Sequence, residues 1–151
     1  MCYISKVEIN SKKTSMKRNA TAVWNGTIKE GKGYLTTQST ILKQAQYSYT
    51  SRFEEGIGTN PEELMAAAHA GCFTMKMSAD LTGAGYSPEM LETSCTITMD
   101  NGVITTSDLV LKAKIEGISD EEFQKIATGA KSNCPVSKAY NLEMSLQASL
   151  I

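Results

Sequence analysis

The stretch between residues 59 and 81 most constrains the fold of this chain, because its composition predicts one long apolar helix. Asn60 is a favoured N-cap, and Pro61 suits the first helical position, where its missing N–H is not needed. The two glutamates that follow place negative charge at the positive end of the helix dipole. Lys76 is then the only charged residue before Asp80. A helix this apolar is expected to lie in a core or between subunits.

The apolar residues of this helix surround most of its axis. One face carries Leu64, Ala68, Cys72 and Met75, and other directions carry Met65, Phe73 and Met77. A membrane-spanning helix is excluded, because the apolar length is too short and is interrupted by Lys76. The small side chains from Ala66 to Gly71 allow a second helix to cross closely. A simple core helix remains the alternative, since a lone cysteine is usually just a small buried hydrophobe.

Length and charge limit the partners of the chain. At 151 residues it is about the size of one domain, and we expect a poorly ordered N-terminal extension at 1–16 followed by a single domain at 17–151. With 15 basic and 16 acidic residues the net charge is −1, which gives no general attraction to nucleic acid or to an anionic membrane. The first 15 residues lack the apolar core of a secretory signal, so we expect a cytoplasmic protein with a small-molecule or protein partner.

The remaining elements are predicted from alternation and turn residues. Three antiparallel strands precede the long helix, and a glycine-containing loop at 51–59 joins them to it. Two strands, two helices and a last strand follow it. The predicted strands are 20–28, 34–37, 41–49, 92–99, 108–115 and 142–151, and the further helices are 119–132 and a short one that begins at 133–135. This order predicts an α+β fold with antiparallel β-sheets and a long buried central helix.

The chain has four cysteines, which are expected to be reduced in the cytoplasm and therefore favour catalytic or redox chemistry over structural disulfides. Cys95 alternates with Ile97 in a predicted strand and is expected to pack. Cys134 directly precedes Pro135 at a predicted helix start, where backbone N–H groups stabilise a thiolate. A half-buried N-cap is an equally good interpretation of that cysteine. Cys72 and Cys134 are 62 residues apart, and the sequence leaves open whether they meet.

Four motifs of the chain carry a resemblance to a known family. They are Arg52-Phe53, Gly58 to Leu64, Ala67 to Phe73 and Asn133 to Ser137. Together they resemble the OsmC/Ohr family of thiol-dependent peroxidases. The resemblance covers about residues 17–151, and the landmarks Trp24-Asn25-Gly26 and Gly31-Lys32-Gly33 are closer to the osmotically inducible OsmC branch than to the organic-hydroperoxide-resistance branch.

The resemblance implies an intertwined homodimer that reduces organic hydroperoxides in stress defence. It makes Cys72 the peroxidatic thiolate and Cys134 the thiol that resolves its sulfenic acid into a disulfide. It also implies that Arg52 and Glu62 organise the site, the carboxylate orienting the guanidinium in a bidentate pair. A dithiol reductant, lipoyl-bearing in related proteins, completes the implied cycle, with no metal or organic cofactor. Without the resemblance, Arg52 is a solvated loop charge and Glu62 a first-turn helix charge.

Helix geometry predicts that such a site needs two chains. Glu62 and Cys72 are ten residues apart, which places them roughly 15 Å apart along one helix. If both serve one site, Glu62 must come from a second copy whose long helix runs antiparallel to the first. The loop before the helix is long enough to leave open which chain supplies Arg52.

Two other function classes stay open. A non-catalytic binding or structural protein would use the apolar helix as a dimer seam and keep its cysteines inert. A cysteine hydrolase would need a histidine directed at Cys72, but the only histidine, His69, lies three residues earlier on the same helix and is poorly placed for that role. We therefore interpret His69 as a packing or hydrogen-bonded residue.

Overall fold

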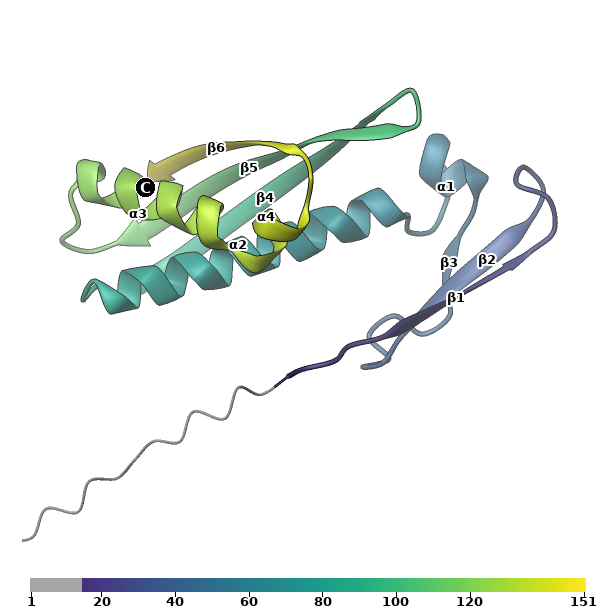
Figure 1. The fold of residues 1–151 in the computed structure, drawn as a ribbon, viewed down its shortest axis with the longest axis horizontal. Coiled ribbons are helices and arrows are strands. Elements are labelled where there is room, and N and C mark those ends of the chain that lie inside the picture. The colour runs from purple at the N-terminus through teal and green to yellow at the C-terminus, as the bar shows by residue number, and fades with distance from the viewer. Residues whose placement is uncertain (1–14) are drawn as a thin grey trace, which may run out of the picture.

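The structure is a computed structural model that describes residues 15–151 (Figure 1). The N-terminal extension expected at 1–16 lies almost entirely outside the described residues. The elements in chain order are β1 (Ala20–Asn25), β2 (Lys32–Thr37), β3 (Ala45–Tyr47), α1 (Tyr49–Phe53), α2 (Pro61–Gly83), β4 (Pro88–Asp100), β5 (Val103–Ile115), α3 (Asp120–Asn133), α4 (Pro135–Ala139) and β6 (Glu143–Leu150). Mixed helices and sheets in this order confirm the predicted α+β class.

The first sheet is the predicted antiparallel meander, in the order β1-β2-β3. Its centre is Gly33, which pairs with Trp24 on one side and Tyr47 on the other, and the two rings pack 5.4 Å apart. A Cβ on Gly33 would lie 2.6 Å from an atom of each ring, so only glycine fits there. The third strand is shorter than the predicted 41–49, because the chain turns with positive φ at Thr40 and Gln44 before it pairs.

A short helix replaces part of the loop that was predicted at 51–59. Ser48 caps α1 through a capping box with Ser51: each side chain accepts a hydrogen bond from the other residue's backbone N–H. The Ser51 hydroxyl is buried and donates to the carbonyl of Thr59, which holds the following loop against the helix. The prediction of strand as far as Tyr49 was therefore wrong, because the local cap outweighs the strand preference of the aromatic residues.

The long helix α2 begins as predicted and ends at Gly83, where the glycine was expected to end it. The Asn60 side chain accepts a hydrogen bond of 2.8 Å from the Glu63 N–H. The fully buried residues recur every fourth position, at His69, Phe73, Met77 and Leu81. The helix was expected to lie in a core or between subunits, and within one chain its Met75 is 77% exposed. One side of α2 is therefore left without a cover in the single chain.

The second sheet has the order β4-β5-β6 and is mixed. Strands β4 and β5 form the predicted antiparallel hairpin, longer than expected at both ends, around a turn in which Asn101 and Gly102 have positive φ. The last strand pairs parallel to β5, with Leu109 opposite Leu146, so the expectation of antiparallel pairing was wrong for β6. Helices α3 and α4 carry the chain back across the sheet, which is the kind of connection that parallel neighbours need.

The hydrophobic core lies between this second sheet and the helices α2 and α3. Its fully buried members are Phe73, Met77, Leu81, Leu109, Leu111, Ala113, Phe123, Ala127, Ala130 and Cys134. Figure 1 shows the first sheet standing apart from this body, beyond the N-terminal end of α2. No helix between residues 15 and 151 is both long and apolar enough to cross a bilayer.

Candidate active site

Two cysteines from distant parts of the chain meet beside α2. Cys72 is half-buried in the middle of α2, and Cys134 is fully buried at the junction between α3 and α4. Cys134 ends α3 by donating its N–H to the Ala130 carbonyl at 2.9 Å, and it is also the N-cap of α4, which Pro135 opens. The two thiols are close enough for each to shift the pKa of the other. The fold thus joins the pair whose contact the sequence left open.

The surroundings of the two sulfurs differ. Burial alone would raise the pKa of Cys134, but hydrogen bonds from the Ser137 N–H, from Cys72, from the Ser137 hydroxyl and from the Val136 N–H outweigh burial and lower that pKa. Burial raises the pKa of Cys72, and the neighbouring Cys134 raises it further, while the Val136 N–H opposes both effects. Within one chain, the thiolate of the pair is therefore favoured on Cys134.

Arg52 and Glu62 form an ion pair at the start of α2. The guanidinium Nε and Nη2 lie 3.1 and 2.8 Å from Glu62 Oε1. Both N–H groups converge on one carboxylate oxygen, whereas a forked bidentate pair was expected. The Glu62 side chain is only 12% exposed, and the guanidinium carbon of Arg52 lies 5.1 Å from the centre of the Phe53 ring. The arginine is thus held on α1 by a carboxylate from α2 of the same chain.

The structure does not bring these two pairs together within one chain. Glu62 lies in the first turn of α2, and ten residues separate it from Cys72, which corresponds to roughly 15 Å along the helix axis. Arg52 is bound to Glu62 and shares its position. The four residues singled out in the sequence therefore form a cysteine pair beside the middle of α2 and an arginine–glutamate pair beside its start.

His69 is a buried hydrogen-bonded residue, as interpreted from its spacing. Its Nδ1 lies 2.6 Å from Ser107 Oγ and its Nε2 lies 2.7 Å from Ser137 Oγ. Both ring nitrogens are thus occupied by serines, and burial lowers the pKa of the imidazole. No sequence signal pointed to the two serines, because they come from β5 and α4, distant along the chain. Cys95 packs against the core as expected, and its sulfur also lies 3.2 Å from Ser107 Oγ.

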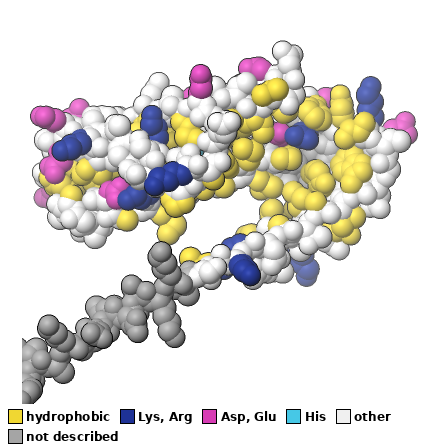
Figure 2. Space-filling view, viewed as in Figure 1, with side chains coloured by type: hydrophobic (Ala, Val, Ile, Leu, Met, Phe, Trp, Pro, Cys, Tyr) yellow, Lys and Arg dark blue, Asp and Glu magenta, His cyan; other side chains and the backbone are white. Residues whose placement is uncertain are grey.

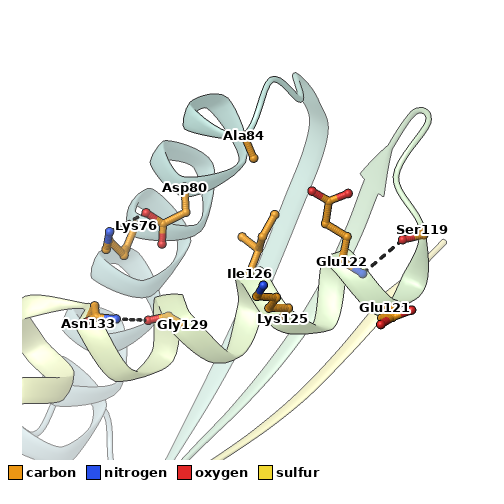
Figure 3. Close-up of a pocket in the computed structure, with 10 residues that line it drawn as sticks. All are labelled: Lys76, Asp80, Ala84, Ser119, Glu121, Glu122, Lys125, Ile126, Gly129 and Asn133. Carbon is orange, nitrogen blue, oxygen red and sulfur yellow. Dashed lines mark hydrogen bonds and ion pairs between the residues drawn. The ribbon is translucent and has the colours of Figure 1, made fainter.

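A groove of about 610 Å³ runs between α2 and α3 close to the cysteine pair (Figure 3). Lys76 and Asp80 form an ion pair on its α2 wall, and Glu122 and Lys125 stand on its α3 side. Lys76 lies one turn beyond Cys72, and Asn133, which also lines the groove, directly precedes Cys134. The groove itself holds charges of both signs and no thiol, so it is a neighbour of the cysteine pair and not the reactive centre.

Comparison with known proteins identifies the family of the chain. The family described as OsmC-like protein matches residues 54–148. The Escherichia coli protein named peroxiredoxin OsmC is 38% identical over 140 residues, which cover 90% of this chain and 98% of that protein. The chain belongs to the OsmC-like family. Glu62, Cys72 and Cys134 of this OsmC-like chain all lie inside the matched segment, and Arg52 lies two residues before it.

Solved structures of OsmC-like and hydroperoxide-resistance proteins share the fold. An OsmC-like protein from Mycoplasma pneumoniae aligns with a TM-score of 0.72 at 13% identity, covering 91% of this chain and 99% of its own. An organic hydroperoxide resistance protein from Elizabethkingia anophelis aligns with a TM-score of 0.66 at 25% identity, covering 92% of this chain and 99% of its own. The agreement extends over nearly the full length of both proteins, so it includes the first sheet as well as the core.

Proposed function

We propose that this OsmC-like protein is a thiol peroxidase that reduces organic hydroperoxides, with Cys72 as the peroxidatic cysteine and Cys134 as the resolving cysteine. The observation that carries the proposal is the contact between these two thiols, which come from α2 and from the α3–α4 junction. The names of its relatives support it, since one is a peroxiredoxin and others are organic hydroperoxide resistance proteins. Oxidative or osmotic stress defence is the corresponding physiological role.

The proposed reaction has three steps. The Cys72 thiolate attacks the outer peroxide oxygen, so that an S–O bond forms, the O–O bond breaks, and the alcohol leaves after protonation. The Cys134 thiolate then attacks the sulfur of the resulting sulfenic acid, forming the disulfide and releasing water. An external dithiol, such as a lipoyl group on a partner protein, reduces the disulfide by exchange. The reducing cytoplasm is the compartment in which this cycle would run.

We further propose that the site is completed by a second copy of the chain, with Arg52 and Glu62 supplied together from the partner's α1 and α2. Within one chain they lie too far from Cys72, and α2 leaves an apolar side exposed around Met75. Figure 2 shows an open hollow between the first sheet and the rest of the molecule, bordered by hydrophobic side chains. Ile57, in the segment that leads into α2, is 87% exposed. An antiparallel second copy would cover these surfaces and place a guanidinium beside each Cys72.

The alternative is a non-catalytic dimeric binding or structural protein with inert cysteines. One observation favours it: the pKa of Cys72 is raised by burial and by Cys134, which disfavours the nucleophilic thiolate in the isolated chain. The two functions make opposite predictions for peroxide consumption, because a raised pKa that persists in the dimer leaves Cys72 unreactive.

Peroxide consumption and intact mass test the proposed function. With a dithiol reductant, the wild-type protein should consume cumene hydroperoxide, and without reductant it should lose the mass of two hydrogens as the disulfide forms. Cys72→Ser should abolish consumption, and Cys134→Ser should accumulate a sulfenic acid that oxidises further. Cys95→Ser is the matched control and should behave as wild type in the mass assay. Consumption by Cys72→Ser, or the absence of any mass change in wild type, would contradict the proposal.

A further inference from the structure

Polar groups from α2, β4, β5 and α4 form one continuous hydrogen-bond network. His69 is at its centre, with Nδ1 2.6 Å from Ser107 Oγ and Nε2 2.7 Å from Ser137 Oγ. Beyond Ser107, the network reaches Cys95, whose sulfur lies 3.2 Å from the serine oxygen. Beyond Ser137 lies Cys134, the N-cap residue of α4 and three residues earlier in the sequence, and the Ser137 hydroxyl is among the groups that lower its pKa. His69, Ser107 and Cys134 are fully buried, so water does not compete for these contacts.

In one arrangement of the hydrogens, every group of this network except the Cys134 thiolate donates one hydrogen bond. A neutral imidazole has one donor and one acceptor nitrogen, and burial keeps His69 neutral by lowering its pKa. In this arrangement the Cys95 S–H donates to Ser107, and the Ser107 hydroxyl donates to His69 Nδ1. The Nε2–H then donates to Ser137, and the Ser137 hydroxyl donates to the Cys134 thiolate. The tautomer is assigned from this network. The reverse direction requires a protonated Cys134 as the first donor.

We propose that this hydrogen-bond network holds the Ser137 hydroxyl as a fixed donor to the Cys134 sulfur. Ser137 and His69 are then positioning residues that stabilise the Cys134 thiolate. The catalytic consequence rests on the proposed peroxidase function. There, the Cys134 thiolate attacks the sulfur of the Cys72 sulfenic acid: the S–S bond forms, the S–O bond breaks, and the departing hydroxide takes up a proton to become water. A positioned donor keeps Cys134 ionised and correctly placed until that attack.

The surroundings of the network agree with donation in the direction from Cys95 to Cys134. Burial raises the pKa of Cys95, which keeps the proton at the far end, whereas the pKa of Cys134 is lowered despite burial. The imidazole is held in place by the ring of Tyr140, which packs against its edge at 5.5 Å while its hydroxyl donates to the Met65 carbonyl. The titratable groups that face the network are Cys72 from α2, Tyr140 from the segment after α4, and Asp108 from β5 beside Cys95.

The test measures the ionisation of Cys134 without any peroxide. Because Cys134 is fully buried, its ionisation is followed in a Cys72→Ala background by the pH dependence of the NMR chemical shift of its Cβ carbon, which needs no reagent to reach the sulfur. Adding Ser137→Ala should move the midpoint to higher pH by about one unit, because a hydrogen bond to a charged acceptor is lost. Ser137→Thr keeps a hydroxyl and should restore the midpoint. Ser132→Ala, an exposed serine on α3 that bonds the Thr128 carbonyl, is the matched control.

A midpoint that does not move in Ser137→Ala, with circular dichroism and thermal unfolding unchanged, would overturn the inference. His69→Phe is a second test, because it removes the partner of Ser137 on the side away from Cys134. It should raise the midpoint in the same direction, and an unmoved midpoint would remove His69 from the proposal. With Cys72 present, Ser137→Ala should slow the conversion of the Cys72 sulfenic acid to the disulfide. A shifted midpoint in a protein that consumes no peroxide would sustain this inference while refuting the peroxidase, and the opposite pair of results would do the reverse.

Discussion

Mixing two inactive variants gives a quantitative test of the proposed shared site. Cys72→Ser removes the nucleophile, and Glu62→Ala removes the carboxylate that holds Arg52 at 2.8 Å. In a heterodimer of the two, one site has lost both groups and the other has kept both. Co-refolding equal amounts yields about half heterodimers by random pairing, each with one intact site, so activity should recover to about a quarter of wild type.

The ion pair within one chain makes this test sharper. Because Arg52 and Glu62 are bonded to each other in the same chain, the partner should supply both together. Arg52→Ala mixed with Cys72→Ser should then recover activity as Glu62→Ala does. Arg52→Ala mixed with Glu62→Ala should recover none, since each site of that heterodimer receives one damaged pair. Recovery in this last mixture would show that the two residues come from different chains.

The assay is cumene hydroperoxide consumption with a dithiol, after denaturation and co-refolding, with heterodimer content read from native mass spectrometry. Glu63→Ala is the matched control, because Glu63 is the neighbouring first-turn glutamate and bonds the Thr59 hydroxyl instead of Arg52. It should be as active as wild type. Failure to recover activity despite confirmed heterodimers, or a monomer by light scattering, would refute the shared site.

Three further outcomes are expected. Phe73→Ala should destabilise the fold by about 3–5 kcal/mol in urea denaturation, because the ring is fully buried, whereas Thr82→Ala on the exposed side should change little. Burial holds the folded-state pKa of His69 below its unfolded value. The stability that neutral His69 contributes is therefore present above about pH 6.5 and lost as the pH falls. Urea denaturation of His69→Phe should lack this pH dependence of the free energy of unfolding. A bulky apolar hydroperoxide should be reduced faster than hydrogen peroxide, through burial of about 0.8 kcal/mol per methylene, and equal efficiency would contradict an apolar pocket.

The sequence predicted the elements whose signals are local. The start of α2 follows from Asn60 and Pro61, and the start of α3 follows from Ser119, whose side chain accepts from the Glu122 N–H. The first sheet follows from its glycine turns. The short helix α1 was missed although Ser48 and Ser51 form a capping box, because alternation through Tyr47 and Tyr49 also fits a strand.

The relations between distant segments could not be predicted in the same way. Alternation of apolar residues in β6 has the same period whether the strand runs parallel or antiparallel to its neighbour, so its direction was beyond the pattern. The contact between Cys72 and Cys134 depends on how α3 packs against α2. Ser107 and Ser137 are unremarkable in sequence, and only the fold places their hydroxyls on the two nitrogens of one imidazole.

The opposed ionisation of the two cysteines gives the proposed dimer a chemical reason. In one chain the negative charge of the pair is favoured on Cys134, and that charge raises the pKa of Cys72. A guanidinium brought beside Cys72 by a second copy would favour the charge on the attacking sulfur. Once Cys72 becomes a sulfenic acid it carries no charge, so it no longer repels a thiolate on Cys134. The Val136 and Ser137 donors then favour the Cys134 thiolate at the step that needs it. Attack and resolution would thus use one negative charge in turn, on Cys72 first and on Cys134 second.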